Sequence, residues 1–250
     1  MSAFKAVVVR ISQGTQYIRD VRGLAPEGFR GLPVLGTSPC APECSACKDA
    51  CPTGAIALEP LRLDLGRCVF CAACVEACPE GKIQFTPEPK LGASTRDDLW
   101  LRQGSTQALR VRASAAFSKV FGRSLRLRQV SAGGCNACEL ELNAIANVNF
   151  DAQRFGIEWV ASPRHADALV VTGPLTRNMQ NAIRLAWDAL PEPRFLVAVG
   201  ACAISGGLYQ TADGIDRGFL EQVGPALFIP GCPPHPLTIV NAILDFLGAE

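Results

Sequence analysis

The sequence predicts an α/β protein in two parts, a small cysteine-rich unit followed by a larger domain built on a parallel sheet. Eight of the twelve cysteines lie in two closely spaced runs between residues 40 and 78. From residue 125 onward, short apolar runs alternate with helical segments, the pattern of parallel α/β sheets. The other four cysteines follow the ends of three of these apolar runs. Both parts therefore present grouped thiols, and the chemistry of the chain depends on what those thiols bind.

Composition narrows the class of protein. A hydrophobic content of 48% is ample for a packed core, and a net charge of +1 argues against a nucleic-acid binder driven by bulk charge. No apolar run approaches the length of about 18 residues needed to span a membrane. The apolar stretch at residues 6–9 is too short for a secretory signal. We therefore expect a chain that is soluble or peripheral in a larger assembly, and its free thiols favour a reducing compartment, which makes the cytoplasm the default.

The number and spacing of the cysteines predict iron–sulfur clusters. Twelve cysteines in 250 residues are too sparse for the disulfide framework of a short secreted chain. Structural zinc is a stronger alternative, because paired C-x2-C units also form tetrathiolate zinc sites. Closely wrapped cysteines with the last one before a proline suit a cuboidal cluster better. Since a 4Fe–4S cluster takes four thiolates from protein, twelve cysteines predict three such clusters.

The first two cysteine runs repeat each other. Cys44, Cys47 and Cys51 recur 27 residues later, and the spacing from the first cysteine of each run is 28, so the first run has one extra residue. A proline follows the last cysteine of each run. This pattern resembles a bacterial-type ferredoxin domain with two 4Fe–4S clusters, in which the fourth cysteine of each run ligates the other cluster. The resemblance implies one cluster on Cys40, Cys44, Cys47 and Cys78, and a second on Cys68, Cys71, Cys74 and Cys51.

Around this unit, changes in composition suggest the domain boundaries. We expect an extended Gly- and Pro-rich arm over residues 1–35, the two-cluster domain over 36–90, a basic linker over 91–124 and the parallel-sheet domain over 125–250. Residues 105–121 of the linker can form a basic amphipathic helix. We expect this helix to contact a partner protein, with a membrane surface or simple packing on its own domain as the alternatives.

The second part has a cysteine beyond the end of several expected strands. Strands are expected at residues 125–130, 157–161, 168–172, 195–199 and 227–229, and helices at 139–147, 178–189 and 237–247. Cys135 and Cys138 follow the first strand, Cys202 the fourth and Cys232 the fifth. Open α/β sheets bind ligands at the carboxyl ends of their strands. A thioredoxin-like redox pair at Cys135 and Cys138 is an alternative, but it leaves the other two cysteines unexplained.

Several motifs in this part carry a family resemblance. They are Gly134-Cys135-Asn136-Ala137-Cys138-Glu139-Leu140-Glu141, residues 161–167, Val171-Thr172-Gly173-Pro174, residues 198–207 and Pro230-Gly231-Cys232-Pro233-Pro234. Together they resemble the small subunit of group 4 NiFe-hydrogenases, of the formate-hydrogenlyase and energy-converting type, and the equivalent subunit of respiratory complex I. The first part resembles the ferredoxin-like subunit of the same complexes, so the chain resembles a fusion of two neighbouring subunits.

The resemblance implies a fold, a site and partners. It implies a flavodoxin-like parallel sheet and a proximal 4Fe–4S cluster on Cys135, Cys138, Cys202 and Cys232. No catalytic residue is expected in this chain, because in the family the NiFe centre lies on a partner large subunit, where 2H⁺ + 2e⁻ ⇌ H₂ takes place. Other subunits of a membrane-bound complex are implied as partners, with an electron donor module such as formate dehydrogenase or ferredoxin.

Two residues depart from the family pattern, and the second of them keeps another function open. Ala137 stands where glycine is frequent in the family, and His235 stands where arginine is common. The alternative is a nickel-free, complex I-like oxidoreductase that passes electrons to quinone or another acceptor. The two-residue gap between Cys135 and Cys138 follows the hydrogenase pattern, since complex I relatives place these cysteines side by side. A zinc-stabilised assembly scaffold is the alternative from a different class.

Three further residues are candidates for tuning the third cluster. Glu139 and Glu141 begin a helix, where acidic side chains are favoured by the helix dipole alone. Their functional alternative is proton transfer or partner contact near the cluster. His235 is expected to influence the cluster through hydrogen bonding or charge.

Overall fold

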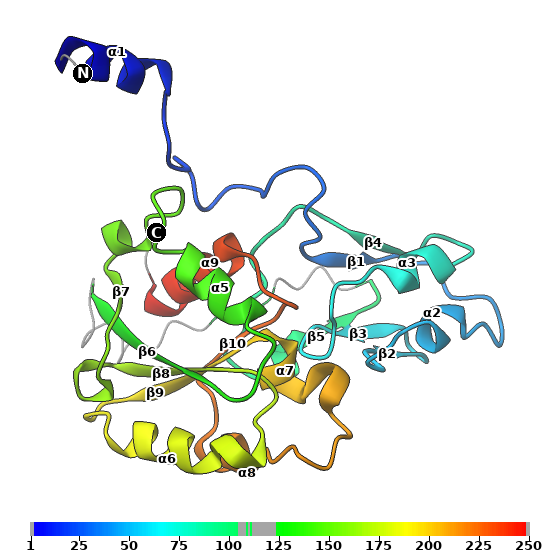
Figure 1. Ribbon diagram of the computed structural model, residues 1–250. Helices are drawn as coiled ribbons and strands as arrows, with labels where there is room; N and C mark the ends of the chain where they lie inside the picture. The colour runs from blue at the N-terminus through cyan, green and yellow to red at the C-terminus, as the bar shows by residue number, and fades with distance from the viewer. Residues whose placement is uncertain (1–2, 105–108, 110, 112–123, 249–250) are drawn as a thin grey trace.

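The computed structural model describes residues 3–104, 109, 111 and 124–248 (Figure 1). The helix expected over residues 105–121 falls almost entirely outside the described residues. No helix within the described ranges is long and apolar enough to cross a membrane.

A parallel five-stranded sheet organises the second part of the chain. Its strands are β6 (Leu125–Ser131), β7 (Ile157–Trp159), β8 (Ala168–Thr172), β9 (Phe195–Val199) and β10 (Leu227–Ile229). They lie in the order β10-β9-β8-β6-β7, and every neighbouring pair is parallel. Strands β8 and β9 are buried at each position, as expected for central strands covered on both faces. This order is the flavodoxin-like one, which confirms the predicted fold class.

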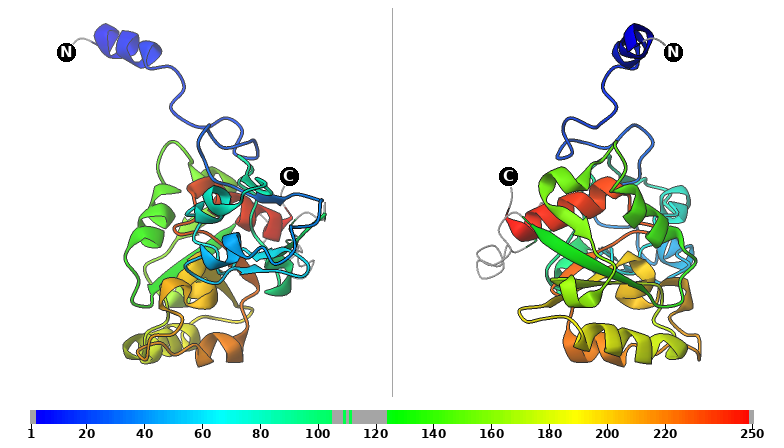
Figure 2. Two further views of the ribbon diagram at one scale, coloured as in Figure 1. Left: turned by 90° about the vertical axis from the view of Figure 1, so that its right-hand side faces the viewer. Right: turned by 60° about the vertical axis from the view of Figure 1, so that its left-hand side comes forward.

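Helices cover both faces of the sheet. On one face α5 (Ala137–Ala144) lies beside α9 (Pro236–Leu247), and on the other are α6 (Gln180–Asp188) and α8 (Gly218–Val223) (Figures 1 and 2). The short helix α7 (Gly200–Ser205) begins directly at the carboxyl end of β9. Single 3-10 turns occur at Asp97–Leu99, Ala152–Phe155, Pro163–His165, Arg177–Met179 and Gly207–Tyr209.

The cysteine-rich unit is built from two small antiparallel sheets and two short helices. Strand β1 (Pro33–Leu35) pairs with β4 (Ile83–Phe85), while β2 (Ile56–Ala57), β3 (Arg62–Asp64) and β5 (Trp100–Arg102) form the second sheet. Helix α2 (Ala46–Asp49) carries Cys47, and α3 (Ala73–Ala77) carries Cys74. Strands β1 and β5 come from outside the expected range 36–90, because the flanking segments supply an edge strand to each small sheet.

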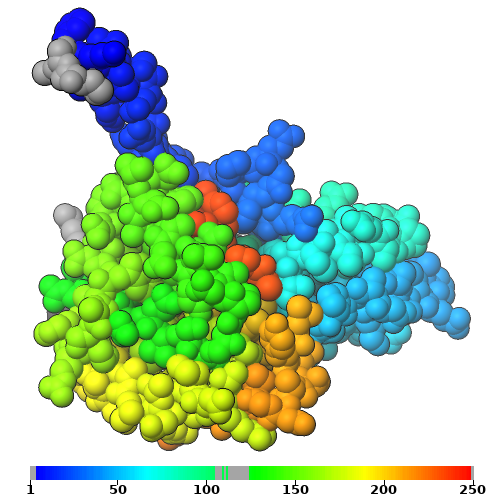
Figure 3. Space-filling view, viewed as in Figure 1, coloured from blue at the N-terminus to red at the C-terminus, as the bar shows by residue number. Residues whose placement is uncertain are grey.

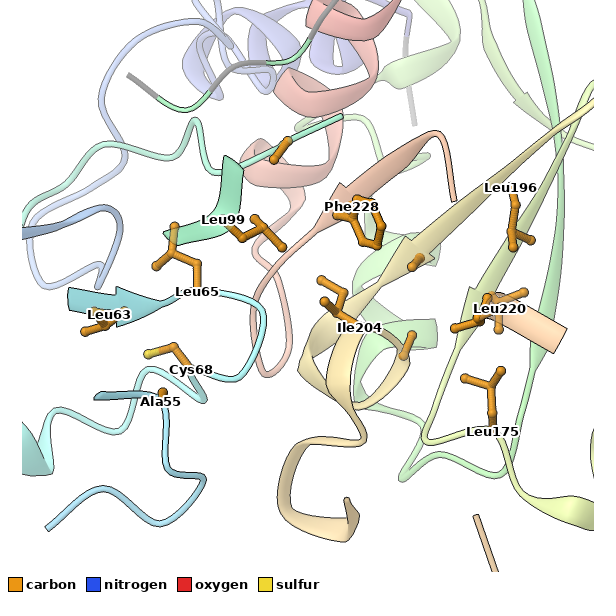
Figure 4. Packing of buried hydrophobic residues seen from close by; sticks show 14 of the residues in the cluster. Ala55, Leu63, Leu65, Cys68, Leu99, Leu175, Leu196, Ile204, Leu220 and Phe228 are labelled. Atoms are coloured by element: carbon orange, nitrogen blue, oxygen red, sulfur yellow. The ribbon is translucent and has the colours of Figure 1, made fainter. Parts of the chain in front are cut away.

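The two parts share one apolar core. Leu63, Leu65 and Leu99 from the cysteine-rich unit belong to the same buried cluster as Ile204 and Phe228 from the sheet domain (Figure 4). Backbone hydrogen bonds also cross the junction. The Ala93 N–H donates to the Phe228 carbonyl at 3.0 Å, and the Phe228 N–H donates back at 2.8 Å. The linker thus covers the exposed edge of β10, and the two parts pack as one body (Figure 3).

The N-terminal arm differs from the extended segment expected over residues 1–35. It begins with a helix, α1 (Ala3–Ser12), which projects away from the body (Figures 1 and 3). This stretch has no glycine or proline, whereas the Gly- and Pro-rich composition begins only at Gly14. Farther along, the arm is tied to α9, where Arg22 forms an ion pair of 2.6 Å with Asp245.

Candidate metal centres

The first cavity gathers cysteines from both runs. Cys40, Cys44, Cys47 and Cys78 line a space of about 350 Å³ together with the apolar side chain of Ile83. Three of these cysteines come from the first run, while Cys78 is the last cysteine of the second. Burial raises the pKa of the Cys47 thiol, and the neighbouring Cys78 and Cys40 raise it further.

The second cavity mirrors the first. Cys51, Cys68, Cys71 and Cys74 line a space of about 300 Å³, and here Cys51 is the residue contributed by the other run. Burial raises the pKa of Cys68 to about 12 and that of Cys74 to about 11. The structure therefore brings the eight cysteines together in the two crossed sets that the ferredoxin resemblance implies.

Backbone donors around these spaces point at sulfur. The Ala55 N–H donates to Cys51 Sγ at 3.2 Å, and the Lys82 N–H donates to Cys78 Sγ at 3.4 Å. Each donor lies four residues after its cysteine, so the repeat reproduces the contact in both runs. The Phe70 N–H donates to Cys68 Sγ at 3.4 Å. Such hydrogen bonds to sulfur are one of the means by which a protein sets the potential of an iron–sulfur cluster.

The third group assembles at the carboxyl edge of the parallel sheet. Cys135 and Cys138 flank the start of α5 after β6, Cys202 lies in α7 after β9, and Cys232 follows β10. Burial raises the pKa of Cys138 to about 12, and Glu139, Cys202, Cys232 and Cys135 are close enough to raise it further. Burial likewise raises the pKa of Cys202 to about 11. Cys135 and Cys232 are exposed, so this group reaches the surface of the described part of the chain.

Two glycines make room for these sulfurs. A Cβ added at Gly200 would come within 2.6 Å of Cys138 Sγ, and the residue has a φ of +88°. A Cβ at Gly207 would lie 3.1 Å from Cys202 Sγ. Both positions need a residue without a side chain, because β9 and α7 run directly past the thiols.

The donor chemistry of all three groups fits iron–sulfur clusters. Buried thiols that raise one another's pKa are costly to ionise without a bound cation, and metal coordination deprotonates them outright. No three His, Cys, Asp or Glu side chains of the described residues are arranged to share a single metal ion. In the cysteine-rich unit the thiols surround a space, as the ligands of a multi-atom cluster do.

Glu139 lies next to the third group as a buried carboxylate. Its Oε1 accepts a hydrogen bond of 2.6 Å from Thr172 Oγ1, and the Ser131 hydroxyl is a second partner. Burial alone would raise the pKa of Glu139, but these hydrogen bonds outweigh it and lower the pKa. The carboxylate is therefore ionised at neutral pH. Glu141 lies farther along the same helix, and its pKa is shifted in the opposite direction, because burial raises it.

His235 has a structural environment. Its Nδ1 accepts a hydrogen bond of 3.1 Å from the Leu237 N–H, so the residue caps the start of α9. The ring packs against Phe29 and Phe150, with centroids 5.0 and 5.9 Å away. Burial lowers the pKa of His235, which favours the neutral ring. Through His235, the loop after Cys232 is joined to the arm, to α9 and to the segment that follows α5.

Arg217 is a residue near the third group that no motif indicates. Its guanidinium donates to the carbonyls of Cys202 at 3.3 Å, Ala203 at 2.9 Å and Ile204 at 2.7 Å. It lies between α7 and α8, fifteen residues after the cysteine, and only the folded chain brings the two together.

The second cysteine group faces the third across the junction. Gln210 Nε2, just beyond α7, donates to the Thr53 carbonyl at 3.3 Å, and Thr53 Oγ1 lies 3.8 Å from Cys51 Sγ. Cys68 and Ile204 belong to the same buried cluster (Figure 4). Helix α2, which carries Cys47 of the first group, lies beside α3 at the end of the unit away from the sheet (Figure 1). The three groups thus follow one another along the molecule.

Comparisons with known proteins agree with this architecture. Residues 40–82 match the 4Fe-4S dicluster domain, and residues 135–246 match the family described as NADH ubiquinone oxidoreductase, 20 kDa subunit. A ferredoxin-type dicluster unit joined to a flavodoxin-like sheet defines an iron–sulfur protein of two fused modules. The chain belongs to this 20 kDa subunit family, which unites hydrogenase small subunits with the equivalent subunit of NADH-quinone oxidoreductase.

Three relatives illustrate the family. The chain is 37% identical over 131 residues to the probable membrane-bound hydrogenase subunit mbhJ of Pyrococcus furiosus, covering 52% of this chain and 78% of that protein. It is 40% identical to formate hydrogenlyase subunit 7 of Escherichia coli, covering 54% of this chain and 52% of that protein. It is 39% identical to a subunit of the NADH-quinone oxidoreductase of Desulfovibrio desulfuricans, covering 44% of this chain and 60% of that protein.

Proposed function

We propose that this chain is the iron–sulfur electron-transfer subunit of a group 4 NiFe-hydrogenase complex. In this proposal the chain holds three 4Fe–4S clusters and contacts a large subunit that carries the NiFe centre. The complex lies at the cytoplasmic side of a membrane, where this chain is peripheral. An external module such as ferredoxin or formate dehydrogenase exchanges electrons with the outer end of the chain.

The observation that carries the proposal is the serial order of three groups of four cysteines. Helix α2, which carries Cys47, lies at the end of the unit away from the sheet, Cys68 lies on the side of the unit that packs with Ile204, and Cys202 lies in α7 at the sheet edge (Figures 1 and 4). Each cluster, when bound, takes up and releases one electron at a time. Two such electrons balance the partner's reaction, 2H⁺ + 2e⁻ ⇌ H₂.

The residues of this chain bind, space and shield the clusters. Apolar side chains such as Leu61 and Ile83 exclude water from the first space, and Leu63 and Phe85 do so for the second. Lower polarity and sulfur-directed N–H groups act on the potential of a bound cluster in opposite directions, so their balance sets it. The exposed Cys135 and Cys232 give the third site a surface through which a partner approaches closely.

A nickel-free, complex I-like oxidoreductase is the second candidate. The relative from Desulfovibrio desulfuricans, a subunit of an NADH-quinone oxidoreductase, favours it. In that case the third site would deliver electrons to quinone or another acceptor. The spacing of Cys135 and Cys138 favours the hydrogenase interpretation, because two residues separate them.

The metal content of the whole complex tests the proposal. The chain is tagged, the complex is purified without oxygen, and nickel, iron and zinc are measured together with H₂-dependent dye reduction. One nickel and about thirteen irons per chain are expected, since each of three clusters contains four irons and the NiFe centre adds one more. About twelve irons without nickel or H₂ activity would support the complex I-like alternative. Zinc in place of iron, without visible cluster absorption, would support a scaffold.

A further inference from the structure

Arg217 ties down the helix that carries Cys202. Helix α7 has only six residues, and the last four carbonyls of any helix lack partners within it. Arg217 donates to three of these carbonyls, those of Cys202, Ala203 and Ile204, at 3.3, 2.9 and 2.7 Å. The Gly206 N–H also donates a hydrogen bond to the Cys202 carbonyl, at 2.8 Å. The position of the Cys202 thiol therefore depends in part on this guanidinium.

The charge of Arg217 has no ion-pair partner among the described residues. The side chains of Arg22, Arg96 and Arg194 each form an ion pair with a carboxylate. Arg217 is half-buried, and its acceptors are neutral carbonyls. Burial and the nearby Arg96 lower the pKa of Arg217, while Glu221 and, to a smaller extent, Cys202 offset part of that effect. A partly buried cation of this kind calls for an anionic group nearby.

The third cysteine group provides such an anion. Four thiolates outweigh the positive charge of a 4Fe–4S core, and one-electron reduction adds a further negative charge. A fixed cation nearby therefore stabilises the reduced state more than the oxidised state. Net charge around a cluster is one of the factors that set its reduction potential.

We propose that Arg217 is a positioning residue that supplies the counter-charge of the third cluster and raises its reduction potential. The proposal rests on the cluster assignment in the proposed function. The positive charge of Arg217 makes the third site easier to reduce than the same cysteines would be alone. Electrons arriving from the Cys51, Cys68, Cys71 and Cys74 site are thereby favoured to move toward the sheet domain.

The test is a potentiometric titration of the purified complex followed by EPR. The Cys202→Ala variant identifies which signal belongs to the third cluster. Arg217→Gln removes the charge but keeps an amide donor, and we expect the third cluster's midpoint potential to become more negative. Arg217→Lys keeps the charge, and we expect a potential close to that of the original chain. The other two clusters should be unaffected in both variants.

Arg194→Gln is the matched control. Arg194 also donates to carbonyls at the end of a helix, those of Trp187 in the last turn of α6 and of Leu190 just beyond it, but this helix carries no cysteine. We expect no change of any cluster potential in Arg194→Gln. A shift of the same size in this variant would assign the effect to general loosening of the fold and overturn the proposal.

The remaining outcomes also decide the question. An unchanged potential in Arg217→Gln, or an equal shift in Arg217→Lys, overturns the role of charge. If Arg217→Gln loses the third cluster, retention of the cluster in Arg217→Lys supports the need for a cation at this position. Loss of the cluster in both variants overturns the proposed role of the charge. If Cys202→Ala removes no signal from the original complex, the cluster assignment itself fails, which is a separate result.

Discussion

At the level of single residues, Cys202 connects the third cysteine group to the rest of the fold. It lies in α7, directly beyond β9, and both Gly206 and Arg217 hydrogen-bond to its carbonyl. We predict that Cys202→Ala removes the third cluster and H₂-linked activity, because three thiolates leave one iron without its protein ligand. The signals of the two ferredoxin-type clusters should persist in EPR spectra. Retained H₂ activity in this variant would contradict the assignment.

The comparison variant for this experiment is Cys44→Ala. Cys44 lines the first cavity, at the far end of the chain's series of sites. Its loss should remove an outer cluster and spare the third cluster signal. The pair of variants therefore separates loss of one site from general loss of iron.

Glu139 should act on the third cluster in the direction opposite to Arg217. The hydrogen bonds from Ser131 and Thr172 lower its pKa, so it is ionised at neutral pH and adds negative charge beside Cys138. Glu139→Gln is expected to make the third cluster's midpoint potential more positive, as measured by EPR titration. The pKa of Glu139 is lower in the folded chain than in the unfolded chain. Its ionised form therefore stabilises the fold at pH values above the unfolded-chain pKa, and this stabilisation is lost as the pH falls through the folded-chain pKa. Because Glu139 stays ionised across the neutral range, the difference in midpoint potential between the original chain and Glu139→Gln should not change with pH in that range.

Glu141→Gln is the matched control on the same helix. Burial raises the pKa of Glu141, and the charges that act on Cys138 include Glu139 but not Glu141. We expect little change in cluster potential for this variant. Equal shifts in both variants would show that the effect belongs to the helix N-terminus and not to the Glu139 contacts.

The sequence indicates the ligands well but not the charges around them. Cysteine spacing alone indicates the first eight thiols, because these ligands recur in short local motifs, whereas the third group also depends on the expected strand ends and the family resemblance. Arg217, Asp64 and Arg96 have no such signature. Their partners are carbonyls or carboxylates far away in the chain, so the interaction exists only once β3, α7 and the linker have packed together.

At the level of elements, the junction of β9 and α7 depends on glycine. A Cβ on Gly200 would come within 2.6 Å of Cys138 Sγ, and the φ of +88° is unfavourable for other residues. Gly200→Ala should therefore displace Cys138 or Cys202, and we expect the iron content to fall from about twelve to about eight per chain. Gly214→Ala is the control, because a Cβ there would meet nothing within 4 Å. A full iron complement in Gly200→Ala would show that the helix can shift without losing the site.

The arm is a second element whose attachment can be tested. Arg22 pairs with Asp245 at 2.6 Å and donates to Asn241 Oδ1 at 2.9 Å, which fastens the arm to α9. Arg22→Ala should increase the rate at which thermolysin cleaves the arm in the purified complex. Arg19→Ala is the control, since the Arg19 side chain contacts Thr15 within the arm itself. Equal protection of both variants would mean that backbone contacts alone hold the arm.

Elements differ in how far their sequence determines them. The strands β8, β9 and β10 have the predicted boundaries, because a fully buried apolar run between turns leaves few alternatives. The strands of the cysteine-rich unit are only two or three residues long. Such short strands have no periodicity to recognise, and their pairing comes from the loops that wrap around the thiols. Helix α7 is only six residues long, so it is also too short to be recognised from a periodic pattern.

At the level of the whole molecule, the junction between the two parts determines whether the three sites work as a series. Gln210 reaches Thr53, Ala93 pairs with Phe228, and Ile204 packs into the same core as Cys68. A rigid junction keeps the distance between the second and third sites constant. The electron-transfer rate between two sites depends on this distance, so the shared core has a functional consequence beyond stability.

The buried charge pair between Asp64 and Arg96 is the polar part of this junction. Asp64 is fully buried, its Oδ1 accepts from Arg96 Nη1 at 2.7 Å, and it also accepts from the Gly66 N–H at 2.9 Å. The Cys68 N–H donates to the Asp64 carbonyl at 3.0 Å, so the pair supports a predicted ligand loop. Without Arg96, the buried Asp64 carboxylate keeps only Arg67, whose Nε is 3.6 Å away and whose side chain is exposed, so most of the compensation of its charge is lost.

We therefore predict that Arg96→Met destabilises the chain by about 3 kcal/mol, the lower end for buried pairs, because Arg96 itself is partly exposed. Loss of cluster absorbance with increasing urea measures the effect in the purified complex. The double variant Arg96→Met/Asp64→Asn removes the stranded charge and keeps an oxygen for Gly66, so it should recover much of the lost stability. If the double variant is no more stable than Arg96→Met, the ion pair is not what couples the two parts. The apolar contacts of Ile204 and Phe228 would then have to hold the second and third sites in register.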